Sequence, residues 1–91
     1  DKLFLCGLNG TMIRFEDNAW HRDFTGERSD LHSVLFHEGS WFAAGSNGTL
    51  LRNSDGNWEA ESQHWRHTLQ ALAATTGGVY AVGSGGIILR R

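Results

Sequence analysis

The chain contains the same short motif three times at a fixed spacing. GLNGTMIR begins at Gly7, GSNGTLLR at Gly45 and the looser GSGGIILR at Gly83, so the copies recur every 38 residues. A period between about 20 and 50 residues is the signature of a solenoid, a propeller or an array. The period divides the chain into repeat 1 (3–40), repeat 2 (41–78) and a partial repeat 3 (79–91).

The same shift superposes residues outside the motif. The matched sets are Phe4, Phe42 and Tyr80; Asp17 and Asp55; Trp20 and Trp58; Arg28 and Arg66; Leu31 and Leu69; and Gly39 and Gly77. The repeat therefore extends along the whole period and specifies a structural unit rather than a single turn.

Length and composition indicate one small domain. With 91 residues the chain is near the lower limit for burying an adequate core alone. Its 12 glycines and absence of proline indicate many tight turns formed by glycine. Cys6 is the only cysteine, which excludes an intrachain disulfide. Because Ala44 and Val82 are its repeat equivalents, Cys6 is predicted to be a small core residue.

Charge and hydropathy argue against two classes of partner. The formal net charge is −2, with acidic and basic residues interspersed, so the chain lacks the basic surface expected for nucleic acid or an anionic membrane. No apolar run approaches the roughly 18 residues that span a bilayer, and the first residues lack the pattern of a signal peptide. The sequence predicts neither partner and no particular localisation.

Each period reads as four short β-strands. In repeat 2, two apolar runs flank Ser46–Gly48, a second turn follows at Asp55–Asn57, and another run begins at Trp58. Asn-Gly between apolar runs is a strong hairpin signal, because both residues tolerate the positive φ of a tight turn. The run from Thr68 to Gly78, like its counterpart one period earlier, supplies the fourth strand. Frequent glycine disfavours helix.

Four antiparallel strands in a period of this length predict an all-β chain of β-propeller blades. Adjacent apolar residues in TMI, TLL and IIL indicate strands that are buried on both faces, as in stacked blades. We expect one complete blade from about Leu31 to Ser62, with Trp20 and Trp58 filling the space between blades.

The chain holds only about 2.4 repeats, whereas propellers usually close with four to eight blades. The first partial blade should lack its innermost strand and the last its outermost strand. An open stack would expose large apolar faces, so we expect identical chains to associate and complete a ring.

The motif resembles a known class of propeller repeat. The pattern G-x-x-G-T followed by two apolar residues and Arg, then Asp and Trp, is similar to BNR/Asp-box-like repeats and in particular to Ycf48/Hcf136-type propellers. NSDGNW and FEDNAW depart from the extended Asp box because Asp and Trp lie closer together. The resemblance covers essentially the whole chain and implies a propeller fold, but hardly any specific function.

The candidate ligand-binding residues lie in loops that should emerge on one face. Trp65, beside His64, Arg66 and His67, could stack on a sugar ring while its polar neighbours bind hydroxyl groups. The alternative is that Trp65 covers a blade edge and that the matched Arg28 and Arg66 form ion pairs between blades. The candidate residues are Asn9, Arg28, Asn47, His64, Trp65, Arg66 and His67.

The sequence gives little support for catalysis, a metal or a cofactor. His64 and His67 have no recognisable third ligand, and the GSGGI turn lacks the context of a phosphate-binding loop. Asp17 and Asp55 are best explained as turn residues that bond their own backbone. A sialidase-like reaction would need a tyrosine nucleophile, but Tyr80 occupies a core position shared with Phe4 and Phe42.

The preferred hypothesis is a non-catalytic propeller module that self-assembles and serves as a protein-binding scaffold. The alternative is a small multivalent carbohydrate-binding lectin. A fragment of a sialidase-like glycoside hydrolase is the least favoured function. The sequence leaves open whether the chain is natural, excised from a longer propeller or engineered.

Overall fold

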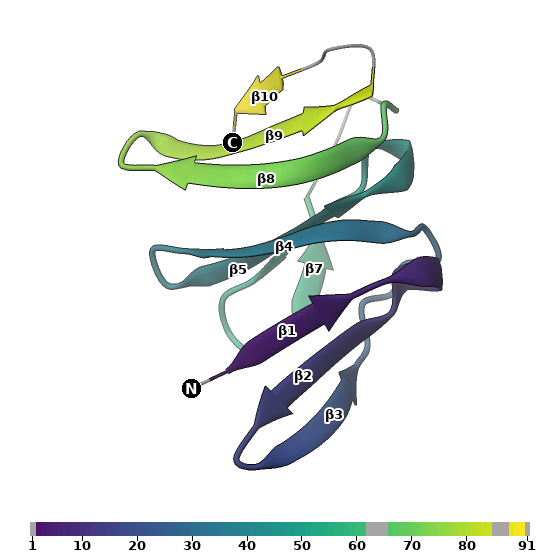
Figure 1. Cartoon of the computed structure of the whole chain (residues 1–91), viewed down its shortest axis with the longest axis vertical. Helices are drawn as coiled ribbons and strands as arrows, with labels where there is room; N and C mark the ends of the chain where they lie inside the picture. The colour runs from purple at the N-terminus through teal and green to yellow at the C-terminus, as the bar shows by residue number, and fades with distance from the viewer. Residues whose placement is uncertain (1, 62–65, 85–87, 91) are drawn as a thin grey trace.

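The structure is a stack of three antiparallel β-sheets (Figure 1). This computed structural model describes residues 2–61, 66–84 and 88–90. Sheet 1 contains β1 (Leu3–Cys6), β2 (Met12–Glu16) and β3 (Ala19–Asp23). Sheet 2 contains β4 (Leu31–His37), β5 (Ser40–Gly45), β6 (Leu50–Asn53) and β7 (Trp58–Ala60). Sheet 3 contains β8 (Leu69–Thr75), β9 (Gly78–Gly83) and β10 (Ile88–Arg90).

The all-β prediction is confirmed: the described residues form ten strands and two short 3₁₀ turns. Neighbouring strands in each sheet are also neighbours in the sequence. The sheets are offset from the sequence repeats by one strand, because β4 ends within repeat 1 and pairs with β5, most of which belongs to repeat 2. Sheets 2 and 3 are therefore each assembled from two successive repeats.

The hairpin prediction at the Asn-Gly turns is confirmed. The short 3₁₀ turns η1 (Leu8–Gly10) and η2 (Ser46–Gly48) connect β1 to β2 and β5 to β6. Asn9 and Asn47 have φ of 58° and 59°, and the glycine that follows each has φ of 72°. These left-handed conformations explain why Asn and Gly recur at these positions. None of the helical segments in the described ranges is long and apolar enough to span a membrane.

The Asp turns differ between the repeats. Asp55 behaves as predicted, because its Oδ1 accepts a hydrogen bond from the backbone N–H of Asn57 at 3.2 Å. Asp17 and Asn18 instead form a tight turn between β2 and β3, with positive φ of 56° and 61°. Two consecutive positive φ angles are typical of a type I′ hairpin turn.

Sheet 2 lies between the other two sheets and forms a core with each (Figure 1). We call the face that a sheet turns toward the preceding sheet in the chain its back face, and the opposite one its front face. The core between sheets 2 and 3 contains Ala44, Leu50, Leu69, Leu72 and Ala81. The equivalent residues 38 positions earlier all belong to the core between sheets 1 and 2, namely Cys6, Met12, Leu31, Val34 and Ala43.

This correspondence shows that one sequence pattern specifies both contacts. The predicted core position of Cys6 is confirmed, because this half-buried residue packs against the first cluster. Burial raises the pKa of the Cys6 thiol, since desolvation disfavours the thiolate.

The prediction that both repeated tryptophans fill space between sheets is confirmed for Trp58; within the chain no described sheet lies next to Trp20, so for Trp20 it stays a prediction. Trp58 is buried, on the back face of sheet 2, where its ring packs edge-on against Phe4 at a centroid distance of 5.3 Å. Trp20 occupies the same position on the back face of sheet 1, which no other described element covers, and it is 58% exposed. A repeat fixes the direction of a side chain, but burial depends on the neighbouring sheet.

Glycine at the start of the motif allows close backbone approach. A Cβ atom added to Gly45 would overlap the carbonyl oxygen of Asp30, and one added to Gly83 would overlap that of Thr68. The same carbonyl groups accept hydrogen bonds from the N–H groups of Ser46 and Ser84, at 2.9 and 3.0 Å. These bonds connect the turn between two strands to the start of the first strand of the same sheet.

We predict that Gly45→Ala lowers the free energy of unfolding by about 1–3 kcal/mol more than Gly7→Ala, because only the first creates an overlap with backbone atoms. Gly7 is a matched control: its φ and ψ of −167° and −153° resemble the −165° and −156° of Gly45, and an added Cβ meets nothing within 4 Å. Urea unfolding of both variants measures the difference. Equal losses would show that the shared backbone conformation, and not the contact, requires glycine.

Candidate functional site

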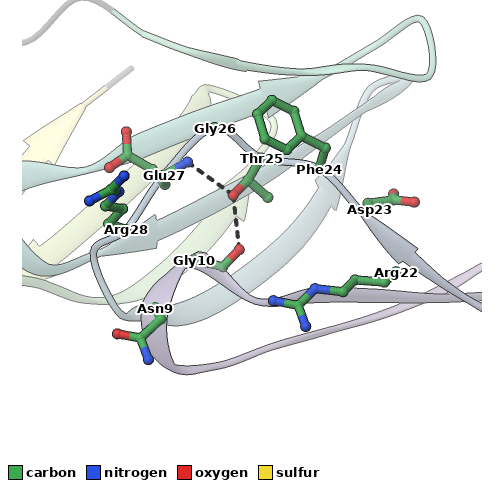
Figure 2. Close-up of a pocket in the computed structure, with 9 residues that line it drawn as sticks. All are labelled: Asn9, Gly10, Arg22, Asp23, Phe24, Thr25, Gly26, Glu27 and Arg28. Atoms are coloured by element: carbon green, nitrogen blue, oxygen red, sulfur yellow. Dashed lines mark hydrogen bonds between the residues drawn. The ribbon is translucent and has the colours of Figure 1, made fainter.

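An open pocket of about 460 Å³ lies at one end of sheet 1 (Figure 2). Turn η1 and the segment that follows β3 form its walls. Its lining residues are Asn9, Gly10, Arg22, Asp23, Phe24, Thr25, Gly26, Glu27 and Arg28. The pocket thus combines the first copy of the recurrent turn with the loop that leads into sheet 2.

Thr25 holds the two walls together. This residue is buried, and its Oγ1 donates a hydrogen bond to the carbonyl oxygen of Gly10 at 2.8 Å (Figure 2). The same Oγ1 accepts a hydrogen bond from the backbone N–H of Glu27 at 3.2 Å. The loop also covers Gly10 so closely that a Cβ there would overlap the Glu27 carbonyl oxygen. These contacts fix the shape of the pocket through the backbone.

A second anchor connects the pocket to sheet 2. The backbone N–H of Asn9 donates to Oδ1 of Asp30 at 2.9 Å, and the N–H of Leu31 donates to the carbonyl oxygen of Gly7 at 2.9 Å. The recurrent turn of sheet 1 is therefore held against the start of β4. The Asn9 side chain itself remains exposed and lines the pocket.

One acidic residue of the pocket is committed to the protein itself. Asp23 accepts a hydrogen bond from Nε of Arg14 at 3.0 Å and another from the indole Nε1 of Trp58 at 3.3 Å. Arg14 also pairs with Glu16. The bond to Asp23, and then that to Glu16, raises the pKa of Arg14 above its ordinary value. This polar cluster connects sheet 1 to Trp58 of sheet 2. The carboxylate of Asp23 is thus bound by Arg14 and Trp58 and not by the pocket residues Arg22 and Arg28.

The binding groups that the pocket presents are the guanidinium groups of Arg22 and Arg28, the carboxylate of Glu27, the amide of Asn9 and the ring of Phe24. Arg22 and Arg28 are exposed, and neither forms an ion pair with an acidic residue of the described part of the chain. Their side chains lie to either side of Gly10 in Figure 2. Phe24 is 88% exposed. An exposed ring beside guanidinium and amide donors can stack on a flat apolar surface while binding hydroxyl or carboxylate groups.

The structure brings together two of the seven candidate ligand residues, Asn9 and Arg28. Asn47 is exposed in η2, and Arg66 and His67 are exposed ahead of β8, but none of the three lines this pocket. His64 and Trp65 lie outside the described residues. The ion-pair hypothesis for Arg28 and Arg66 is not supported, since both are exposed and neither pairs with a described acidic residue.

Sequence reasoning missed Phe24, Arg22 and Thr25. Residues 24–26, FTG, align after the 38-residue shift with Ser62, Gln63 and His64, so the repeat carried no signal for this loop. An isolated Thr-Gly after a strand was the available indication of a structured turn. In the described ranges, no cluster of three or more His, Cys, Asp and Glu residues is arranged to hold a metal ion.

Comparison with protein-family models, curated proteins and solved structures found no match to this chain.

We predict that Thr25→Val lowers the free energy of unfolding by about 1–3 kcal/mol, because this nearly isosteric change leaves the Gly10 carbonyl and the Glu27 N–H without their partner. Thr25→Ser is the matched control, since it keeps the hydroxyl group. Urea denaturation provides the free energies, and amide hydrogen exchange of Glu27 reports on the loop. Similar behaviour of the Val and Ser variants would contradict the proposed role of the hydroxyl.

Proposed function

We propose that the chain is a non-catalytic β-propeller repeat module, which self-assembles through the uncovered faces of its sheets and serves as a protein-binding scaffold. In this hypothesis each sheet is a blade of the BNR/Asp-box-like type. Identical chains associate until the blades close into a ring, as head-to-tail contacts do when the rotation per chain divides the circle. Loops at the ends of the strands are then available for a partner.

The arrangement of the strands supports the propeller hypothesis. Sheet 2 has four strands in the order β4-β5-β6-β7, as in a propeller blade. The first strands of sheets 2 and 3, β4 and β8, lie side by side (Figure 1). In a propeller the first strands of the blades gather around a common axis. The turn geometry of Asp55 also agrees with a repeat of the Asp-box-like kind.

The observation that carries the proposal is the apolar back face of sheet 1. Leu3 and Leu5 are each 50% exposed there, beside Trp20 at 58%. The rings of Phe15 and Trp20 pack together on this face, tilted by 52° with centroids 4.7 Å apart. Ile13 completes the row next to Leu5. Arg22, opposite Ile13 on the edge strand β3, is the charged residue of this face. An exposed row of apolar side chains that includes a tryptophan is typical of a protein interface.

We predict that the 91-residue chain has a native mass of several chains, measured by sedimentation at increasing concentration. Trp20→Ala should weaken association by at least about tenfold, because tryptophan is among the residues whose truncation costs most at interfaces. Leu8→Ala is the control, since Leu8 is 67% exposed in η1 and lies on no sheet face. A folded wild-type chain that stays monomeric at all concentrations would refute self-assembly.

A second candidate function is carbohydrate binding at the pocket of sheet 1. The observation that favours it is that the exposed ring of Phe24 lines the same pocket as the polar side chains of Asn9, Arg22 and Arg28. Aromatic rings stack on the apolar face of a sugar, and an assembly of several chains would gain avidity from multiple equivalent pockets.

The lectin hypothesis predicts binding on a glycan array that Phe24→Ala abolishes. Phe36→Ala is the control for loss of an exposed phenylalanine, because Phe36 is 52% exposed on β4 and does not line this pocket. Circular dichroism should confirm that both variants fold. Unchanged binding by the Phe24 variant would place the sugar elsewhere, and no binding by wild type would remove this function.

A further inference from the structure

We propose that the front face of sheet 3 in one copy of the chain packs on the back face of sheet 1 in the next, so that assembly is head to tail and never back to back. This inference rests on the proposed self-assembly, and it names the two surfaces that join. It follows from the way in which the repeat forms the two contacts inside the chain.

The pairing registers assign residues to the two outer faces. Leu3, Phe15 and Trp20 are cross-strand neighbours, as are Leu5 and Ile13. They project away from Phe4 and Met12, which pack toward sheet 2, and therefore form the back face of sheet 1. On sheet 3, Ala71 lies opposite Val82 and Ala73 opposite Tyr80. These four alternate with the buried Val79 and Ala81 and therefore form the front face of sheet 3.

Both contacts inside the chain join a front face to a back face. In the first, Cys6 and Met12 of sheet 1 meet Ala43 of sheet 2. In the second, Ala44 and Leu50 of sheet 2 meet Ala81 of sheet 3. Every residue of the second contact corresponds to a residue of the first shifted by one period, and the first contact adds the aromatic residues Phe4, Trp41 and Trp58. The sequence therefore encodes one kind of contact, in which a front face packs on a back face. At the two ends of the stack, the back face of sheet 1 and the front face of sheet 3 remain uncovered.

The residues of the proposed contact between two copies are found by shifting those of the internal contacts by one more period. Val82 takes the place of Cys6 and Ala44, and Tyr80 the place of Phe4 and Phe42. From the next copy, Leu5 takes the place of Ala43 and Ala81. Trp20 takes the place of Trp58, so its indole would meet Tyr80 as Trp58 meets Phe4 inside the chain.

The two outer faces also complement each other in size. The front face of sheet 3 presents the exposed side chains of Ala71, Ala73 and Val82, which are small, beside the half-buried ring of Tyr80. The back face of sheet 1 presents Leu and Trp side chains and the exposed Arg22, so two back faces would oppose bulky groups. Sheet 1 has no counterpart of β4, so the positions of Leu31 and Val34 are not filled at this contact. We therefore expect the contact between chains to be weaker than those within a chain.

Two blocked variants test the direction of assembly. Leu5→Glu places a charge on the back face alone, and Val82→Glu places one on the front face alone; both residues are exposed, at 50% and 42%. Each variant alone should be monomeric by sedimentation and native mass spectrometry. An equimolar mixture should form a one-to-one heterodimer and nothing larger, because one intact front face and one intact back face remain. Leu8→Glu is the control and should assemble like wild type.

The outcomes separate this inference from the function on which it rests. A wild-type chain that does not associate refutes both. If wild type associates but the Val82→Glu variant still forms homodimers, the head-to-tail inference is wrong and a back-to-back contact replaces it. Two folded monomeric variants that fail to form a heterodimer also overturn the inference. Thermal unfolding of each variant, followed by circular dichroism, verifies that both remain folded.

Discussion

The burial of both faces of each sheet is the constraint on which the structure depends. A strand such as Met12–Glu16 or Leu50–Asn53 contributes apolar side chains to both faces of its sheet. A single sheet in water would therefore leave apolar surface exposed on both faces. Sheet 2 meets this requirement with one neighbour on each side. Sheets 1 and 3 meet it on one side only. The strands' apolar residues on both faces thus explain both the buried cores between the sheets and the uncovered apolar faces at the ends of the stack.

Much of the fold could be predicted from the sequence, because its signals are local or periodic. Asn9 and Asn47 marked hairpin turns through their tolerance of positive φ, and the period placed Cys6 among core positions. The exposure of Trp20 could not be predicted from its match to Trp58. The reason is that burial depends on an element outside the sheet, whereas the repeat specifies only the strand and the direction of the side chain.

The candidate site was harder to predict than the fold. Asn9 and Arg28 were recognised because they lie at repeated positions, and the structure does place them around one pocket. Phe24 and Thr25 belong to a loop that the repeat does not preserve, so periodicity could not detect them. The hydrogen bonds of Thr25 depend on the approach of η1 to this loop, which only the folded chain establishes.

The offset of one strand between sheet and repeat has a consequence for how such chains change length. Since β4 pairs with β5 across the boundary between two repeats, a duplication or loss of one whole 38-residue unit restores the same pairing at the new junction. Every sheet of the longer or shorter chain would inherit hairpins and packing residues that already fit. Recombination between repeats can therefore vary the size of the stack in whole steps, without requiring new compensating substitutions.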